Sequence, residues 1–166
     1  MSVTNPVSSD QQLVRLLQMG IVLEEVVEAR ASKHYESLAN RDDFEPDPAV
    51  RALLTEAGEE SAEHRARLEG LIDQLGAETV PFDRIEGLVE ERYSQTDPGS
   101  FDDILYDQLH GEESAYKFYD DLLVAIEDSE TTFDIDHDHL VGTLSAIREE
   151  EARGVEQVTA LMSEDR

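Results

Sequence analysis

The stretch that decides the fold is LYDQLHGEESAYKFY, residues 105–119. Its apolar side chains, continued to residue 126, recur at helical spacing and form one stripe: Leu105, Leu109, Tyr116, Tyr119, Leu123 and Ile126. Glu112 falls in the middle of this stripe, seven residues after Leu105 and seven before Tyr119. A lone buried carboxylate is strongly destabilising or gives up its charge unless a cation meets it. The pattern therefore predicts a core-facing helix that carries an ionisable group on its buried side.

Three further segments show the same helical periodicity, and none shows the alternation of a strand. The expected helices span about 10–39, 48–75, 101–128 and 136–163. Ser9 or Asp10 is a candidate N-cap for the first helix, and Asp134 or Asp136 for the last. Gly76 suits the C-terminal end of the second.

The connections between these helices predict their topology. Short loops join the first helix to the second and the third to the fourth, which makes two antiparallel hairpins. The link 77–100, broken by Pro81, Pro98 and Gly99, is long enough to cross the whole bundle. We expect one domain, 1–166: an all-α, antiparallel four-helix bundle of two hairpins joined by a long crossover, the topology of ferritin-like folds.

Composition narrows the function classes. The net charge is −27, with only two lysines, so no basic patch exists to meet the phosphates of nucleic acid. This acidic, lysine-poor composition resembles that of proteins from salt-loving archaea. The chain has no cysteine and no apolar run near the ~20 residues of a membrane span, so we expect no membrane partner and a cytoplasmic location.

The first helix repeats part of the third. Glu28-x-x-Ala31-x-x-His34-Tyr35-x-x-Leu38 matches the stretch that begins at Glu112, with an offset of 112 − 28 = 84 residues. The repeat places Glu28 where Glu112 sits. Glu24, one turn earlier, is a second inward candidate.

The other two helices also carry ionisable groups on their apolar sides. His64 lies in mid-stripe on the second helix, with Glu60 one turn before it, and Glu151 lies between Ile147 and Val155 on the fourth. Carboxylates with an imidazole suit iron or manganese, and bundle cores are where such sites are built. The sequence therefore predicts metal ligands at Glu28, Glu60, His64, Glu112 and Glu151, holding one or two ions.

These motifs resemble the rubrerythrin-like branch of the ferritin-like superfamily over about residues 10–162. The resemblance implies carboxylate ligands at Glu28 and Glu112, with His64 and Glu151 each supplying one member of a Glu-x-x-His pair. The partners of those pairs are replaced, because Ser61 stands where Glu is needed and Gly154 where His is needed. Glu60 would substitute after a small helix rotation, and water would fill the place at Gly154; a one-metal site fits equally.

The function implied by the resemblance is oxidation of Fe(II) by O2 or peroxide at a partly degenerate di-iron or di-manganese site. The expected partners are metal ions and further copies of the chain, in a homodimer or larger homo-oligomer. The alternative is a non-catalytic, metal-free ferritin-like scaffold or dimerisation protein, so enzymatic activity is left open. Buried Glu–Arg pairs or protonated carboxyls would then account for Glu112 and Glu151.

The remaining histidines are predicted to be structural. We expect His34 to be a partly buried packing residue and Asp107 with His110 to form a surface pair. Residues 136–139, DHDH, are expected to be a capping turn.

Overall fold

A computed structural model describes residues 6–39, 48–79 and 101–163 of the chain. Within these ranges the secondary structure is four helices and no strand: α1 (Asp10–Ala39), α2 (Pro48–Leu75), α4 (Phe101–Glu127) and α5 (His137–Ser163). The predicted all-α class is confirmed, and every helix begins and ends within one residue of its expected bounds. Most of the predicted crossover, residues 80–100, lies outside the described residues.

Local hydrogen bonds set the helix ends. The side chain of Ser9 accepts from the Gln12 N–H at 3.1 Å, and the Asp136 carboxylate accepts from the His139 N–H at 2.9 Å. Each satisfies a backbone donor that the first turn of a helix leaves free, so both N-cap predictions are confirmed. Gly76 directly follows α2 with a φ of +65°, a left-handed conformation that favours glycine at a helix C-terminus.

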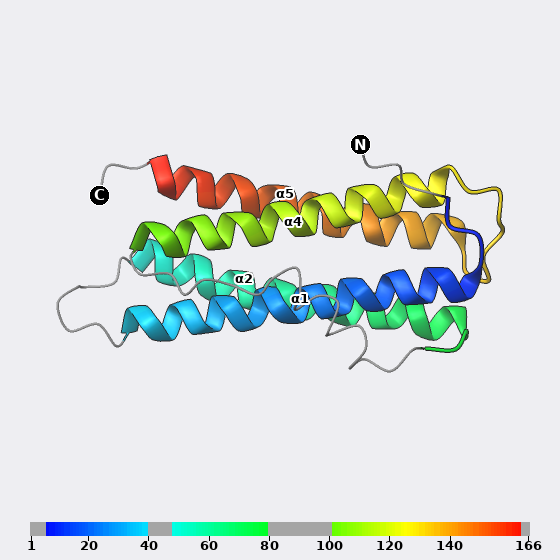
Figure 1. Cartoon of the computed structure of the whole chain (residues 1–166), viewed down its shortest axis with the longest axis horizontal. Helices are drawn as coiled ribbons and strands as arrows, with labels where there is room; N and C mark the ends of the chain where they lie inside the picture. The colour runs from blue at the N-terminus through cyan, green and yellow to red at the C-terminus, as the bar shows by residue number, and fades with distance from the viewer. Residues whose placement is uncertain (1–5, 40–47, 80–100, 164–166) are drawn as a thin grey trace.

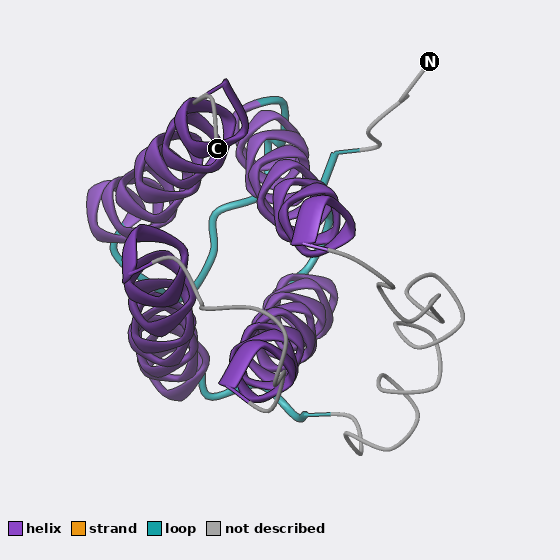
Figure 2. Cartoon of the chain, turned by 90° about the vertical axis from the view of Figure 1, so that its left-hand side faces the viewer, coloured by secondary structure: helices purple, strands orange, loops and turns teal. Residues whose placement is uncertain are grey.

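The helices pack as a bundle around a common centre (Figure 2). The most extensive contacts join α1 to α2 and α4 to α5, and α1 also contacts α4, as α2 contacts α5. Each helix thus has two neighbours within the described part of the chain.

Contacts at the two ends of the bundle fix which helix ends meet. The start of α1 lies beside the end of α4, because the Val7 N–H donates to the Ala125 carbonyl at 3.2 Å. Gln74, near the end of α2, lies 3.1 Å from His139 at the start of α5. At the opposite end Arg51 donates to the Tyr35 hydroxyl at 3.0 Å, which joins the end of α1 to the start of α2. Figure 1 shows the same arrangement.

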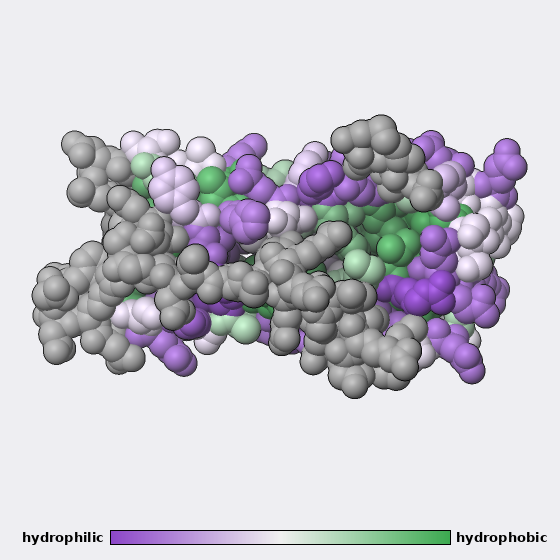
Figure 3. Space-filling model, viewed as in Figure 1, coloured by the Kyte–Doolittle hydropathy of each residue, from purple (hydrophilic) through white to green (hydrophobic). Residues whose placement is uncertain are grey.

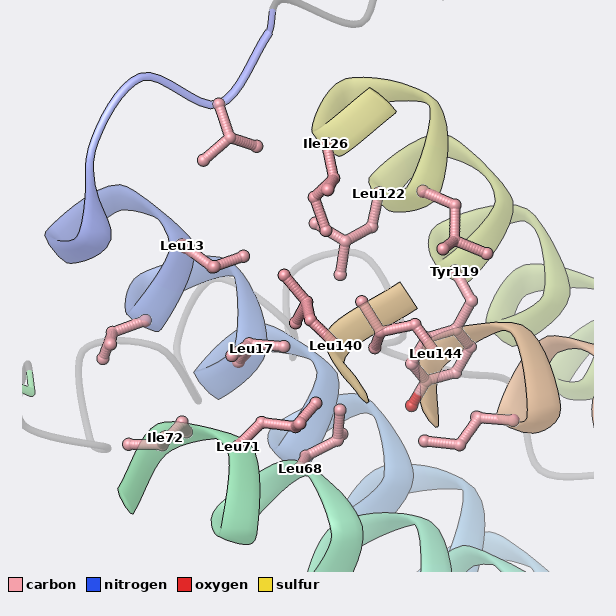
Figure 4. Close-up of a cluster of buried hydrophobic side chains, with 14 of the residues drawn as sticks. Leu13, Leu17, Leu68, Leu71, Ile72, Tyr119, Leu122, Ile126, Leu140 and Leu144 are labelled. Carbon is pink, nitrogen blue, oxygen red and sulfur yellow. The ribbon is translucent and has the colours of Figure 1, made fainter. Parts of the chain in front are cut away.

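The apolar core is divided into two clusters along the bundle. The first, at the end where α1 begins, is drawn in Figure 4 and includes Leu13, Leu17, Leu68, Leu71, Tyr119, Leu122, Leu140 and Leu144. The second, at the other end, comprises Ala31, Leu38, Val50, Leu53, Leu54, Ile104, Leu105 and Val158. Burial of each large aliphatic side chain stabilises the fold by roughly 1.5–3 kcal/mol. The segment between the clusters is occupied by polar groups.

On the face drawn in Figure 3, hydrophilic residues line the edges, and hydrophobic residues are visible between α1 and α4 near the start of α1. None of the described helices contains a stretch long and apolar enough to cross a membrane.

Candidate metal centre

Each helix contributes one ionisable side chain to the space between the two apolar clusters. We call this set the buried polar layer: Glu24 from α1, His64 from α2, Glu112 from α4 and Glu151 from α5. Their exposed fractions are 0%, 0%, 6% and 3%. Helical periodicity places them there, because apolar core residues precede and follow each of them at turn spacing along the same face.

Three of these residues, Glu24, His64 and Glu151, lie close together and come from three of the four helices. We call them the inner group. The Nδ1 atom of His64 lies 3.2 Å from Oε2 of Glu24 and 3.0 Å from Oε1 of Glu151. The ligand atoms of these three residues all lie within 4.8 Å of one another, so one metal ion could contact all of them. The donor set is one imidazole nitrogen and two carboxylates, without sulfur.

Glu24 is the residue of this group that its protein neighbours leave least satisfied. Its Oε2 accepts a hydrogen bond from the Tyr119 hydroxyl, and Tyr119 is itself fully buried. Its Oε1 is buried and has no hydrogen-bond partner, the one such side-chain atom found in the described residues. Buried carboxylate oxygens are normally paired, so this atom points to a missing cationic or donor partner.

Glu112 lies against α5 at Gly154. A Cβ built on Gly154 would be 2.5 Å from Oε2 of Glu112, closer than real contacts allow. Gln108 donates to Oε1 of Glu112 at 3.1 Å. The Glu112 carboxylate thus occupies the space that a side chain at position 154 would need, and a water at that ligand position stays a prediction.

Two further carboxylates face the other ring nitrogen of His64. Its Nε2 is 3.3 Å from Oε1 of Glu150 and 3.8 Å from Oε1 of Glu60. The other oxygen of Glu150, Oε2, accepts a hydrogen bond from Nη1 of Arg67 at 2.8 Å. We call Glu60, His64 and Glu150 the outer group; both carboxylates are partly exposed.

Among the described residues, His64 is the one side chain within the layer that can carry a positive charge. No lysine or arginine in the described residues is buried, and Arg67 reaches only the outer group. Burial, then the charge of Glu24 and the hydrogen bond with Glu112, raise the pKa of Glu151 far above its ordinary range. Burial also raises the pKa of Glu112, although hydrogen bonds with Glu151 and Gln108 oppose it. Both shifts express the cost of burying several anions together, which either protons or a metal cation would relieve.

His64 and Tyr119 respond to the same anions. Burial alone would lower the pKa of His64, but the hydrogen bond and charge of Glu24 outweigh it and raise the value. Burial, followed by the charge of Glu24, raises the pKa of the Tyr119 hydroxyl, which therefore stays a hydrogen-bond donor.

The structure brings His64, Glu112 and Glu151 together as the sequence predicted, and it places Glu60 at the outer side. Glu28 lies outside the layer: its side chain is 33% exposed and its Oε1 is 3.0 Å from Nη1 of Arg65. Ligation by Glu28 stays a prediction, but Glu24 holds the inward position on α1. Its signal was in the heptad spacing, seven after Leu17 and seven before Ala31.

Glu150 is the member of the site that sequence reasoning missed. It follows Glu149 and precedes Glu151 in an acidic run, so nothing in the pattern separates it from a solvated residue. Its position next to His64 depends on how α2 and α5 face each other.

His34 lies in the core, as the sequence predicted, and also pairs with an acidic residue. His34 is buried, and its Nε2 lies 2.7 Å from Oδ2 of Asp107. Asp107 also accepts two hydrogen bonds from Arg30. Asp107 is therefore linked across to α1, and its predicted pair with His110 stays a prediction.

Comparison of the chain with protein-family models, curated proteins and solved structures finds no match. The assignment of the site therefore depends on its own geometry.

Proposed function

We propose that this chain is a ferritin-like metal-binding protein whose buried polar layer binds a divalent cation. The proposed architecture is an antiparallel bundle in which the link 77–100 crosses from the first hairpin to the second. It is supported by the helix ends that meet at each end of the bundle and by the position of the layer in mid-bundle, where ligands from facing helices converge.

The observation that carries the metal proposal is the unpaired Oε1 of Glu24. This atom belongs to a fully buried side chain in a group of three ligand-type residues, and no lysine or arginine of the described ranges pairs with that group. A divalent cation would pair with Glu24 and Glu151 and would take a lone pair from His64. Protein neighbours alone leave that carboxylate oxygen without a partner.

Iron and manganese are the ions that the donor set favours. Two or three carboxylates with one imidazole form a hard, oxygen-rich site, and the absence of cysteine removes the thiolates that soft metals prefer. A bound iron ion would supply the redox chemistry, which is the oxidation of Fe(II) by O2 or peroxide. The chain's own part is to hold the ligands in a dry layer, where the Tyr119 hydroxyl donates to Glu24.

Metal analysis of freshly purified protein tests this function. We expect near-stoichiometric iron or manganese, a rise in Tm of several degrees over chelator-treated protein, and loss of both in Glu151→Ala, which removes one of the three proposed ligands. A ligand at one hundred times its Kd stabilises the folded state by ~2.7 kcal/mol. Absence of bound metal in the wild type, together with no rise in Tm on adding Mn2+ or Fe2+, would exclude the proposal.

One observation favours the alternative of a metal-free scaffold. Burial raises the pKa of both Glu112 and Glu151, so a proton on either carboxyl would relieve part of the charge without a metal ion. A metal-free bundle would show the same Tm with and without chelator. A cytoplasmic location and a homo-oligomeric state remain predictions from the sequence.

A further inference from the structure

His64 faces two sets of carboxylates, one at each ring nitrogen. Its Nδ1 meets Glu24 and Glu151, and its Nε2 meets Glu150 and Glu60. On each side, His64 and the two carboxylates lie close enough together to hold one ion. By donor geometry the site could take two cations with the ring between them, once His64 releases its remaining N–H proton to solvent and bridges as an imidazolate.

The two sides differ in the charge that the protein already supplies. Within residues 6–39, 48–79 and 101–163, no arginine or lysine pairs with the inner group, which contains the unpaired Oε1 of Glu24. In the outer group Glu150 is shared, with one oxygen 3.3 Å from His64 and the other bonded to Arg67 at 2.8 Å. Both Glu150 oxygens are thus engaged before any ion arrives.

We infer that the site holds one divalent cation, at the inner group, because the Arg67 guanidinium takes the place of a second cation at the outer group. This inference rests on the proposed metal-binding function and specifies its stoichiometry. Arginine stays protonated and pairs strongly with carboxylates, so it acts as a permanent positive charge. A second divalent ion beside it would meet like-charge repulsion and a carboxylate whose oxygens are both taken.

The outer group lies beside open space, so a second cation could reach it unless Arg67 kept it out. Arg67 and Glu150 both line a groove of about 620 Å³ between α2 and α5, which leads toward the outer group. Solvent cations would reach Glu150 through that groove. Arg67, whose side chain is 33% exposed, stands where they would bind.

The test is the number of Mn2+ ions bound per full-length chain, counted by calorimetric titration and by electron paramagnetic resonance of free Mn2+. We expect one ion in the wild type, two in Arg67→Ala and Arg67→Met, and one in Arg67→Lys, which keeps the charge. The double variant Arg67→Ala with Glu150→Gln should return to one. Arg65→Ala is the matched control and should stay at one, because Arg65 lies on the same helix with similar exposure but pairs with Glu28.

The possible results separate this inference from the function on which it rests. Two ions in the wild type, or one in both Arg67→Ala and Arg67→Met when circular dichroism shows them folded, would overturn the inference alone. No ion in the wild type would overturn the metal-binding function itself.

Discussion

The carboxylate of Glu112 fills the space that any side chain at Gly154 would need, with Oε2 2.5 Å from the position of a Cβ. A glycine in mid-helix is normally a weak point, destabilising by roughly 0.5–1 kcal/mol relative to alanine. Here it lets a carboxylate from α4 reach α5 and join Glu151. Gly154 therefore leaves room for the Glu112 carboxylate against α5.

Gly154→Ala is expected to destabilise the protein by about 1–3 kcal/mol, because the new methyl group overlaps Glu112 in a packed layer. Gly58→Ala, in the interior of α2, is the control. A Cβ at Gly58 meets nothing within 4 Å, so this change should stabilise the protein by roughly 0.5–1 kcal/mol. Urea denaturation measures both. Equal effects of the two substitutions would show that Glu112 does not occupy the space at Gly154.

The metal-free protein is expected to lose stability as pH rises from about 4.5 to about 7. Burial is the largest influence on Glu60 and raises its pKa from 4.5 to about 7, against the opposing charge of His64. Between these values the folded chain keeps a proton that the unfolded chain releases, so the free energy of unfolding falls with rising pH.

Urea denaturation of chelator-treated protein at pH 5 and pH 8 measures that fall, in molar salt to screen the net charge of −27. Glu60→Gln should reduce it, whereas Glu59→Gln, at an exposed neighbouring position, should leave it intact. The raised pKa values of Glu112 and Glu151 act in the same direction, so part of the fall remains. A fall as large in Glu60→Gln as in Glu59→Gln would contradict the prediction.

Asp107→Asn is expected to cost about 1–2 kcal/mol at pH 7, since hydrogen bonds to a charged group from Arg30 and His34 are weakened. Burial alone would raise the pKa of Asp107, but the hydrogen bonds of His34 and Arg30 lower it from 3.8 to about 2. The stabilisation is therefore present above pH 3.8 and disappears as pH falls toward 2.

Asp121→Asn is the control for this change, because it removes the same charge from a pair with the exposed Lys117. Its effect should stay within about 0.5 kcal/mol. Denaturation curves at pH 7 and near pH 2.5 give the loss of stability in each variant, and the difference between the variants should shrink at the lower pH. An equal loss in the two variants at pH 7 would refute the role of Asp107.

Much of the fold was predictable because it depends on local chemistry. Ser9, Gly76 and Asp136 mark helix ends through their own side chains or backbone conformation, and the apolar stripes set which face of each helix is buried. His64 and Glu151 were found for the same reason, since each interrupts a stripe at helical spacing.

The rest of the site depends on tertiary packing. The repeat between α1 and α4 drew attention to Glu28, but Arg65 pairs with that residue near the surface while Glu24 takes the buried position. The contact of Glu150 with His64 and the entry of Glu112 at Gly154 arise from how neighbouring helices face each other. The spacing within α1 could separate Glu24 from Glu28, but periodicity within one helix cannot predict the contacts of Glu150 and Glu112 with other helices.

The most direct test of the central claim compares Mn2+ binding to Glu24→Gln and Glu28→Gln by calorimetric titration. Both changes remove one carboxylate from α1, but only Glu24 belongs to the buried polar layer. We predict that Glu28→Gln binds Mn2+ like the wild type, whereas Glu24→Gln loses at least roughly tenfold in affinity, because even residues that only orient a ligand cost 10–100-fold. Equal affinity in the two variants would contradict a metal centre built on Glu24.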